Sequence, residues 1–85
     1  MWIVATDKNI WNIDNMQGIE LIEVNDKYFV SAIFSNGFEV RLTTEYKNKY
    51  TPKHILKDII RELKDGQLIY DVLHRLRLTR GDKKK

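Results

Sequence analysis

The first half of the chain alternates apolar and polar side chains in the way that is typical of β-strands. Residues 2–6 and 10–13 are short β-favouring runs, and each ends in a polar cluster typical of a turn. Longer runs follow over residues 19–24, 28–35 and 38–44. The sequence therefore predicts four or five antiparallel strands that follow one another as a β-meander.

Asn36-Gly37, between the last two runs, is the strongest turn signal in the chain. A type I′ turn needs positive φ at both central residues, which suits this pair, and a two-residue loop here pairs Ile33 with Val40. The core face would then consist of Phe29, Ile33, Phe38, Val40 and Leu42, with Ser31 and Ser35 as small members. The register of residues 19–24 stays open: a two-residue loop before Tyr28 adds Ile22 and Val24 to this face, and a three-residue loop adds Leu21 and Ile19.

The second half predicts helices. A helix over residues 52–65 would begin with Thr51 as N-cap and Pro52 as the first helical residue, and it would end at Gly66. Its apolar stripe consists of Ile55, Leu56, Ile59, Ile60 and Leu63. Because an isolated sheet of this size needs its apolar face covered, we expect this stripe to pack on one face of the meander.

The same spacing repeats after Gly66, at Leu68, Ile69, Val72, Leu73 and Leu76, and predicts a short second helix. A strand is the alternative over residues 67–78, because Leu76-Arg77-Leu78 also alternates. We expect a single α+β domain over residues 1–78. Residues 79–85 are polar and basic with nothing to bury, which predicts a flexible tail.

Composition narrows the class of protein. A chain of 85 residues is one small domain, and the absence of cysteine excludes a disulfide scaffold and a thiolate metal site. No apolar run is long enough to span a bilayer and the start does not resemble a signal peptide, so a cytoplasmic protein that does not enter membranes is expected. Residues 1–44 hold three basic and six acidic side chains, whereas residues 45–85 hold twelve basic and six acidic ones.

The ionisable residues do not form an enzyme-like pattern. His54 and His74 are far apart with no metal-ligand spacing, and the four glycines do not cluster as a phosphate loop would. Asp58, Glu62 and Asp65 alternate with basic residues, as on a solvated helix face. The sequence therefore favours a binding protein that is not an enzyme and that uses neither cofactor nor metal.

A protein partner is the leading expectation. On a second helix, aromatic, aliphatic and basic side chains would share the side away from the apolar stripe, and such a mixture is enriched in contact surfaces. This ridge consists of Tyr70, His74, Arg77 and Leu78. Together with the partly apolar second face of the sheet, it leaves a surface that association would cover, and a homodimer would do so.

Nucleic acid is the alternative partner. Tyr46-Lys47-Asn48-Lys49-Tyr50 interleaves aromatic and basic residues before the helix, as a site that stacks single-stranded bases would. Basic side chains on the helices would add phosphate contacts without reading sequence. These are Lys53, Lys57, Lys64 and Arg75.

Several segments together resemble a group of small uncharacterised proteins encoded by phages and prophages of low-GC Gram-positive bacteria. They are Met1-Trp2-Ile3, Ala32-Ile33-Phe34-Ser35-Asn36-Gly37, a Tyr-Lys segment and Ile55-Leu56-Lys57-Asp58-Ile59-Ile60. The resemblance covers about residues 1–65 and rests on short, degenerate patterns. It implies no site residues, only a setting: a phage accessory protein that acts in a bacterial cell by binding a host or phage component.

Overall fold

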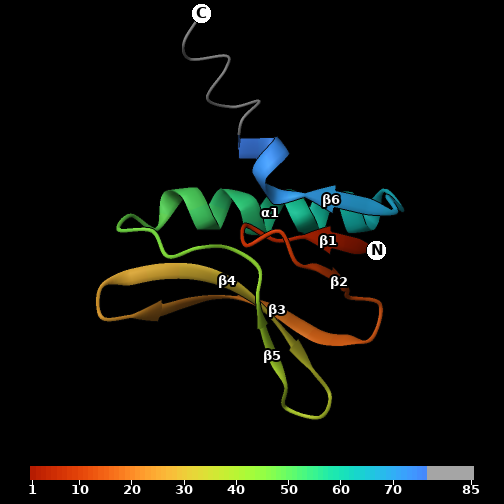
Figure 1. Cartoon of the computed structure of the whole chain (residues 1–85), viewed down its shortest axis with the longest axis horizontal. Coiled ribbons are helices and arrows are strands. Elements are labelled where there is room, and N and C mark those ends of the chain that lie inside the picture. Colours follow the sequence, from red (N-terminus) through yellow and green to blue (C-terminus); the bar gives the residue numbers. More distant parts are fainter. Residues whose placement is uncertain (77–85) are drawn as a thin grey trace, which may run out of the picture.

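The computed structural model describes residues 1–76, and its strands form two three-stranded sheets (Figure 1). In the first sheet, the central strand β1 (Trp2–Val4) pairs antiparallel with β2 (Ile10–Asn12) and parallel with β6 (Ile69–Asp71). The second sheet has the order β3 (Met16–Val24), β4 (Lys27–Phe34) and β5 (Glu39–Arg41), with both pairs antiparallel. The chain is therefore α+β.

The expectation of a single meander of four or five strands is correct only for β3, β4 and β5. The first two strands do not continue that sheet, because the free edge of β1 is occupied by the C-terminal strand β6. The backbone N–H of Trp2 donates to the carbonyl of Leu68 at 2.7 Å, just before β6 begins. A pairing between the two ends of the chain leaves no local trace in the sequence.

The two hairpins of the second sheet differ in loop length: the first has the two-residue loop that was one of the two alternatives, and the second has one residue more than expected. Asn25 and Asp26 have φ of 52° and 63° and form the two-residue loop that pairs Val24 with Lys27. At the other hairpin only Gly37 has positive φ, and Asn36 accepts a hydrogen bond from the backbone N–H of Phe38. That turn is a three-residue loop, closed by a hydrogen bond from the Phe34 N–H to the Phe38 carbonyl.

The longer loop shifts the predicted register by one residue. Ala32, not Ile33, lies opposite Val40, so Val40 of β5 and Leu42 just after it share a face with Val30 and Ala32 and not with Ile33. Of the proposed core members, Phe29, Ser31, Val40 and Leu42 are buried as expected, whereas Ile33 is half-buried and Ser35 and Phe38 are exposed. The buried set on this face is Val30, Ala32, Val40 and Leu42. Ile19 of β3 packs against it, because Ile19 lies opposite Ala32.

The predicted helix is confirmed as α1 (Tyr50–Lys64). It begins two residues early: Lys49 is the N-cap, and the Asn48 side chain accepts a hydrogen bond from the N–H of Thr51. Thr51 as N-cap is therefore wrong, although Pro52 still lies in the first turn, where its missing N–H has no helical partner to lose. Gly66 ends the helix as expected, with φ of 74° and the paired hydrogen bonds of a Schellman motif.

The short second helix predicted after Gly66 is only partly present. The chain forms β6 first, and helical residues start at position 72 and continue to position 76. Pairing with β1 overrides the helical spacing of the apolar residues here. Arg77, Leu78 and the expected tail over residues 79–85 lie outside the described residues.

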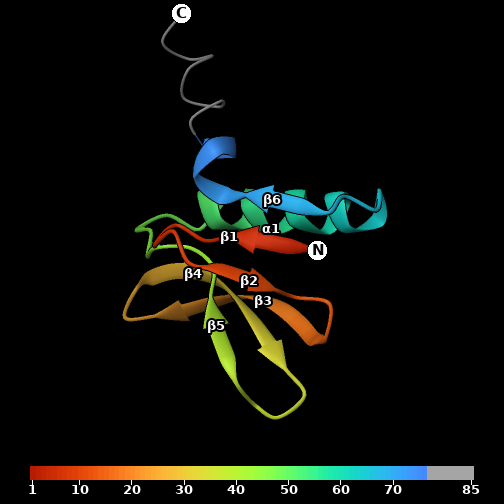
Figure 2. The ribbon, with the colours of Figure 1, turned by 45° about the vertical axis from the view of Figure 1, so that its right-hand side comes forward.

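Helix α1 packs on β3 and β4 of the second sheet, and β6 runs beside it in both ribbon views (Figures 1 and 2). The helix and the two sheets share one core. Its buried members are Ile3, Ile13, Val30, Ala32, Val40, Leu42, Ile55, Ile59, Tyr70 and Val72. The apolar stripe of the helix is thus buried through Ile55 and Ile59, whereas Ile60 faces outward.

Gly66→Ala tests the helix end. A Cβ at this position would have no atom within 4 Å, so its effect comes only from the positive φ. We expect the free energy of unfolding, measured with urea, to fall by about 1 kcal/mol. Gly18→Ala is the matched control, because its Cβ is equally unobstructed but its φ is not positive. That variant should be unchanged or up to about 1 kcal/mol more stable, and equal losses in both would contradict the argument.

Candidate functional site

Helix α1 turns two carboxylates toward the interior. Asp58 and Glu62 are buried and share the face of Ile55 and Ile59, because these four positions follow the spacing i, i+3, i+4 and i+7. The expectation that Asp58 and Glu62 belong to a solvated helix face is therefore wrong. Only Asp65, just after the helix, is exposed as expected.

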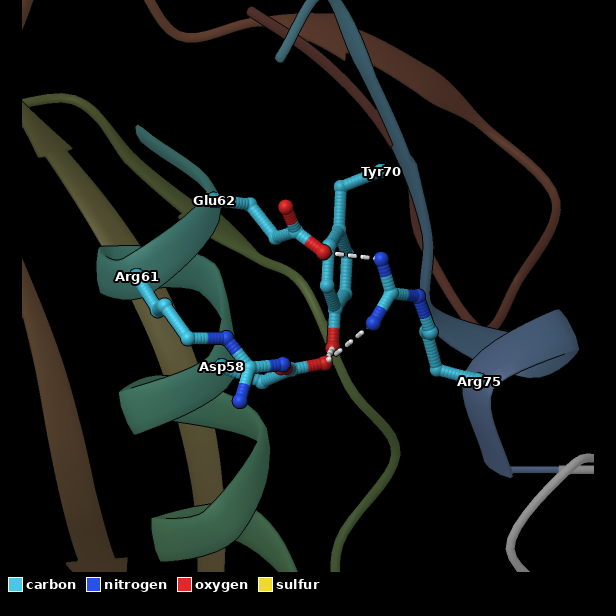
Figure 3. A network of polar contacts seen from close by, with 5 residues as sticks. All are labelled: Asp58, Arg61, Glu62, Tyr70 and Arg75. Atoms are coloured by element: carbon cyan, nitrogen blue, oxygen red, sulfur yellow. Dashed lines mark hydrogen bonds and ion pairs between the residues drawn. The ribbon is translucent and has the colours of Figure 1, made fainter. Parts of the chain in front are cut away.

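The partners of these carboxylates come from the C-terminal segment (Figure 3). The hydroxyl of Tyr70 on β6 donates to Asp58 Oδ2 at 2.6 Å. Arg75 in the helical residues 72–76 donates through Nη1 to the same oxygen at 3.2 Å and through Nη2 to Glu62 Oε1. The guanidinium also lies 5.2 Å from the centre of the Tyr70 ring.

Arg61 completes this buried cluster from the solvent side of the helix. Its side chain is exposed, and its Nη2 donates to Asp58 Oδ1. Two carboxylates thus face two guanidinium groups and one phenol, so the formal charges cancel within the cluster. The arrangement joins α1 to β6 and to the residues that follow β6.

Two members of the cluster, Tyr70 and Arg75, have a raised pKa. Burial, and then the hydrogen bond and the charge of Asp58, raise the pKa of Tyr70, so the phenol stays a donor. Burial alone would lower the pKa of Arg75, but its hydrogen bond to Glu62 and the charge of Asp58 outweigh this and raise it. A protonated phenol and two engaged guanidinium groups serve to hold structure together rather than to exchange protons.

The predicted partner ridge is not formed by the described residues. Tyr70 is only 2% exposed and points at Asp58, because it lies on a strand and not on a helix. His74 is exposed, while Arg77 and Leu78 lie outside the described residues. The surface proposed for a protein partner therefore does not include its aromatic residue, Tyr70.

Six of the eight residues suggested for nucleic acid are exposed, and Tyr46 and Arg75 are the two exceptions. Tyr46 is half-buried and exchanges backbone hydrogen bonds of 2.8 Å with Tyr28, and Arg75 belongs to the buried cluster. The other six are exposed and line the start and the outer side of α1. We call this set the basic face: Lys47, Lys49, Tyr50, Lys53, Lys57 and Lys64.

The burial of Asp58 and Glu62 makes the outer side of α1, which belongs to the basic face, more positively charged. Lys53, Lys57 and Lys64 lie on one side of α1, opposite Asp58 and Glu62. Arg75, which is partly exposed, and Arg61, which is exposed, compensate the charges of those two buried acids. In the sequence, Asp58 and Glu62 reduce the net positive charge of the helix. In the structure, these acids and the lysines lie on opposite sides of the helix.

The described part of the chain has few features of a catalytic centre. A hollow of about 650 Å³ lies between Thr6, Arg41 and Leu73, and Asp7 is the one carboxylate among the described residues around it. His54 and His74 are exposed, and within residues 1–76 no three His, Asp or Glu side chains are grouped as metal ligands would be.

The chain matches no protein-family model, no curated protein and no solved structure. Within residues 1–76, no helix is both long and apolar enough to cross a membrane.

Tyr70→Phe tests the buried cluster through its pH dependence. An unfolded tyrosine loses its proton near pH 10, whereas folded Tyr70 keeps its proton to higher pH. Above that pH the unfolded state binds fewer protons, so the free energy of unfolding falls as pH rises. We expect the wild type to lose up to about 1.4 kcal/mol per pH unit more than Tyr70→Phe between about pH 10 and 11, measured by urea unfolding.

Tyr50→Phe serves as the control, because Tyr50 is largely exposed and its removal should leave the alkaline slope of the wild type unchanged. If Tyr70→Phe loses stability with pH as steeply as the wild type, the phenol is not held protonated by this cluster.

Proposed function

We propose that the protein acts by binding and not by catalysis, and that its basic face contacts the phosphate backbone of nucleic acid. One observation carries this proposal: α1 buries Asp58 and Glu62 and leaves its outer side to lysines. Clustered lysines neutralise phosphates and release counterions, and this supplies most of the free energy of binding that is independent of sequence.

The start of α1 favours a single strand over a duplex. Tyr50 is largely exposed at the first helical position, with Lys47 and Lys49 just before it and Lys53 one turn later. An aromatic ring flanked by basic side chains can stack on a base while its neighbours contact phosphates, whatever the base. We therefore expect weak binding with little dependence on sequence.

A protein partner stays a second proposal, now without Tyr70 in its surface. The proposed setting, an accessory protein of a phage in the cytoplasm of a bacterial host, is supported only by the resemblance of about residues 1–65.

Binding of a fluorescent single strand of about 20 nucleotides tests the proposal by anisotropy. We expect a dissociation constant in the micromolar range at about 50 mM salt and a steep loss of affinity as salt rises. Lys53→Glu/Lys57→Glu should weaken binding at least about tenfold, because it places acids where phosphates would lie. Tyr50→Ala should weaken it less and without changing the dependence on salt.

The control is Lys8→Glu/Asn15→Glu/Gln17→Glu, which makes the same change in net charge at exposed positions outside α1 and outside the basic face. It should keep most of the affinity, since the contact depends on where the charge lies. Equal losses in the two variants would show attraction to net charge alone, and no binding by the wild type at about 50 mM salt would remove the proposal.

A further inference from the structure

The outer side of the first sheet is apolar although it faces solvent. Side chains alternate along β1, so Ile3 points into the core while Trp2 and Val4 point away from it. Along β6, Tyr70 points at α1 and Ile69 points to the opposite side. Trp2 is therefore exposed, whereas Trp11 packs against the core.

Strand register brings the exposed apolar residues together. Ile69 lies directly beside Trp2 in the parallel pair, and Ile10 lies beside Val4 in the antiparallel pair. We call the three most exposed members the outer patch: Trp2 at 48%, Ile10 at 60% and Ile69 at 66%.

The area of the outer patch is large for so short a chain. At roughly 150–250 Å² for a large side chain, these three expose on the order of 350 Å² between them. This lies within the range of the largest apolar patch on a typical monomer, which is often a contact site. Two such patches brought face to face would remove about 700 Å² from water, an area in the range of weak and transient contacts.

We propose that the outer patch binds a second copy of this chain and forms a two-fold symmetric dimer. The members of the outer patch are apolar, and the charged side chain on the same face of β6, Asp71 beside Val4, accepts a hydrogen bond from the backbone N–H of His74. A two-fold contact between the apolar members can therefore form without matching charges on a partner. The basic face lies on the far side of the molecule, because Ile69 points away from the helix that Tyr70 contacts. Two positively charged chains can therefore meet at this patch with their lysines kept apart.

The dimer does not depend on nucleic-acid binding, but it would place two basic faces on one particle. A strand long enough to reach both would bind with an effective concentration that a monomer lacks. Because the interface lies at the small end of the range, we expect a dissociation constant between about 1 and 100 µM.

Sedimentation velocity of the full chain without nucleic acid, from about 1 µM to about 1 mM, measures the equilibrium directly. The wild type should pass from monomer to dimer over this range at about 0.15 M salt. Ile69→Lys should raise the dissociation constant at least about tenfold, because it places a charge in the centre of an apolar contact. In Trp11→Phe, which keeps Trp2 as the only tryptophan, the fluorescence should shift to shorter wavelength as the dimer forms.

Val24→Lys is the matched control, since Val24 is 46% exposed and lies on β3, outside the outer patch. It should dimerise as the wild type does, and thermal melting of both variants shows that they are folded. A wild type that stays monomeric at about 1 mM overturns the proposal, as do equal losses in the two lysine variants. Either result would leave the nucleic-acid assay unaffected, so the two proposals fail separately.

Discussion

The ionic contact between α1 and the C-terminal segment decides how the rest of the molecule is arranged. Asp58 and Glu62 can be buried only because Tyr70 and Arg75 satisfy them, since an uncompensated charge in the interior is strongly destabilising. Turning α1 about its axis by one residue would carry both acids away from these partners and a lysine toward the core. The cluster therefore sets which side of the helix faces outward, and the lysines follow from that choice.

The same contact explains why β6 belongs to the first sheet. Tyr70 reaches Asp58 only if its strand runs beside the helix, and alternation then sends Ile69 to the opposite side. One buried phenol thus determines both the orientation of the basic face and the exposure of the outer patch. A buried ionic cluster contributes little net stability compared with apolar packing, so specifying this arrangement is the better account of its presence.

Local signals in the sequence predicted the local structure well. The helix over residues 50–64 and its end at Gly66 follow from apolar spacing and glycine chemistry, which act within a few residues. The register predicted at Asn36-Gly37 was wrong because an Asn-Gly pair fits both a two-residue loop and a three-residue loop. The preferred helix was wrong for residues 69–71, and the strand that was the alternative is correct there, because this strand depends on pairing with β1, far away in the sequence.

The buried acids were missed for a physical reason. Asp58 with Arg61, or Glu62 with a basic neighbour, shows the same spacing on a solvated helix as beside a buried cluster. Two features distinguished these acids. They lie beside Ile55 and Ile59 on the inner side of the helix wheel, and their partners Tyr70 and Arg75 lie too far away in the sequence for a local pattern to connect them. Charge counted along the chain understates how basic a surface is whenever the acids are turned inward and compensated there. Here Arg75 and Arg61 are both paired with these acids, so the unpaired basic side chains on the outer side of α1 within the described residues are its lysines. A lysine ammonium is strongly hydrated until a phosphate replaces the water.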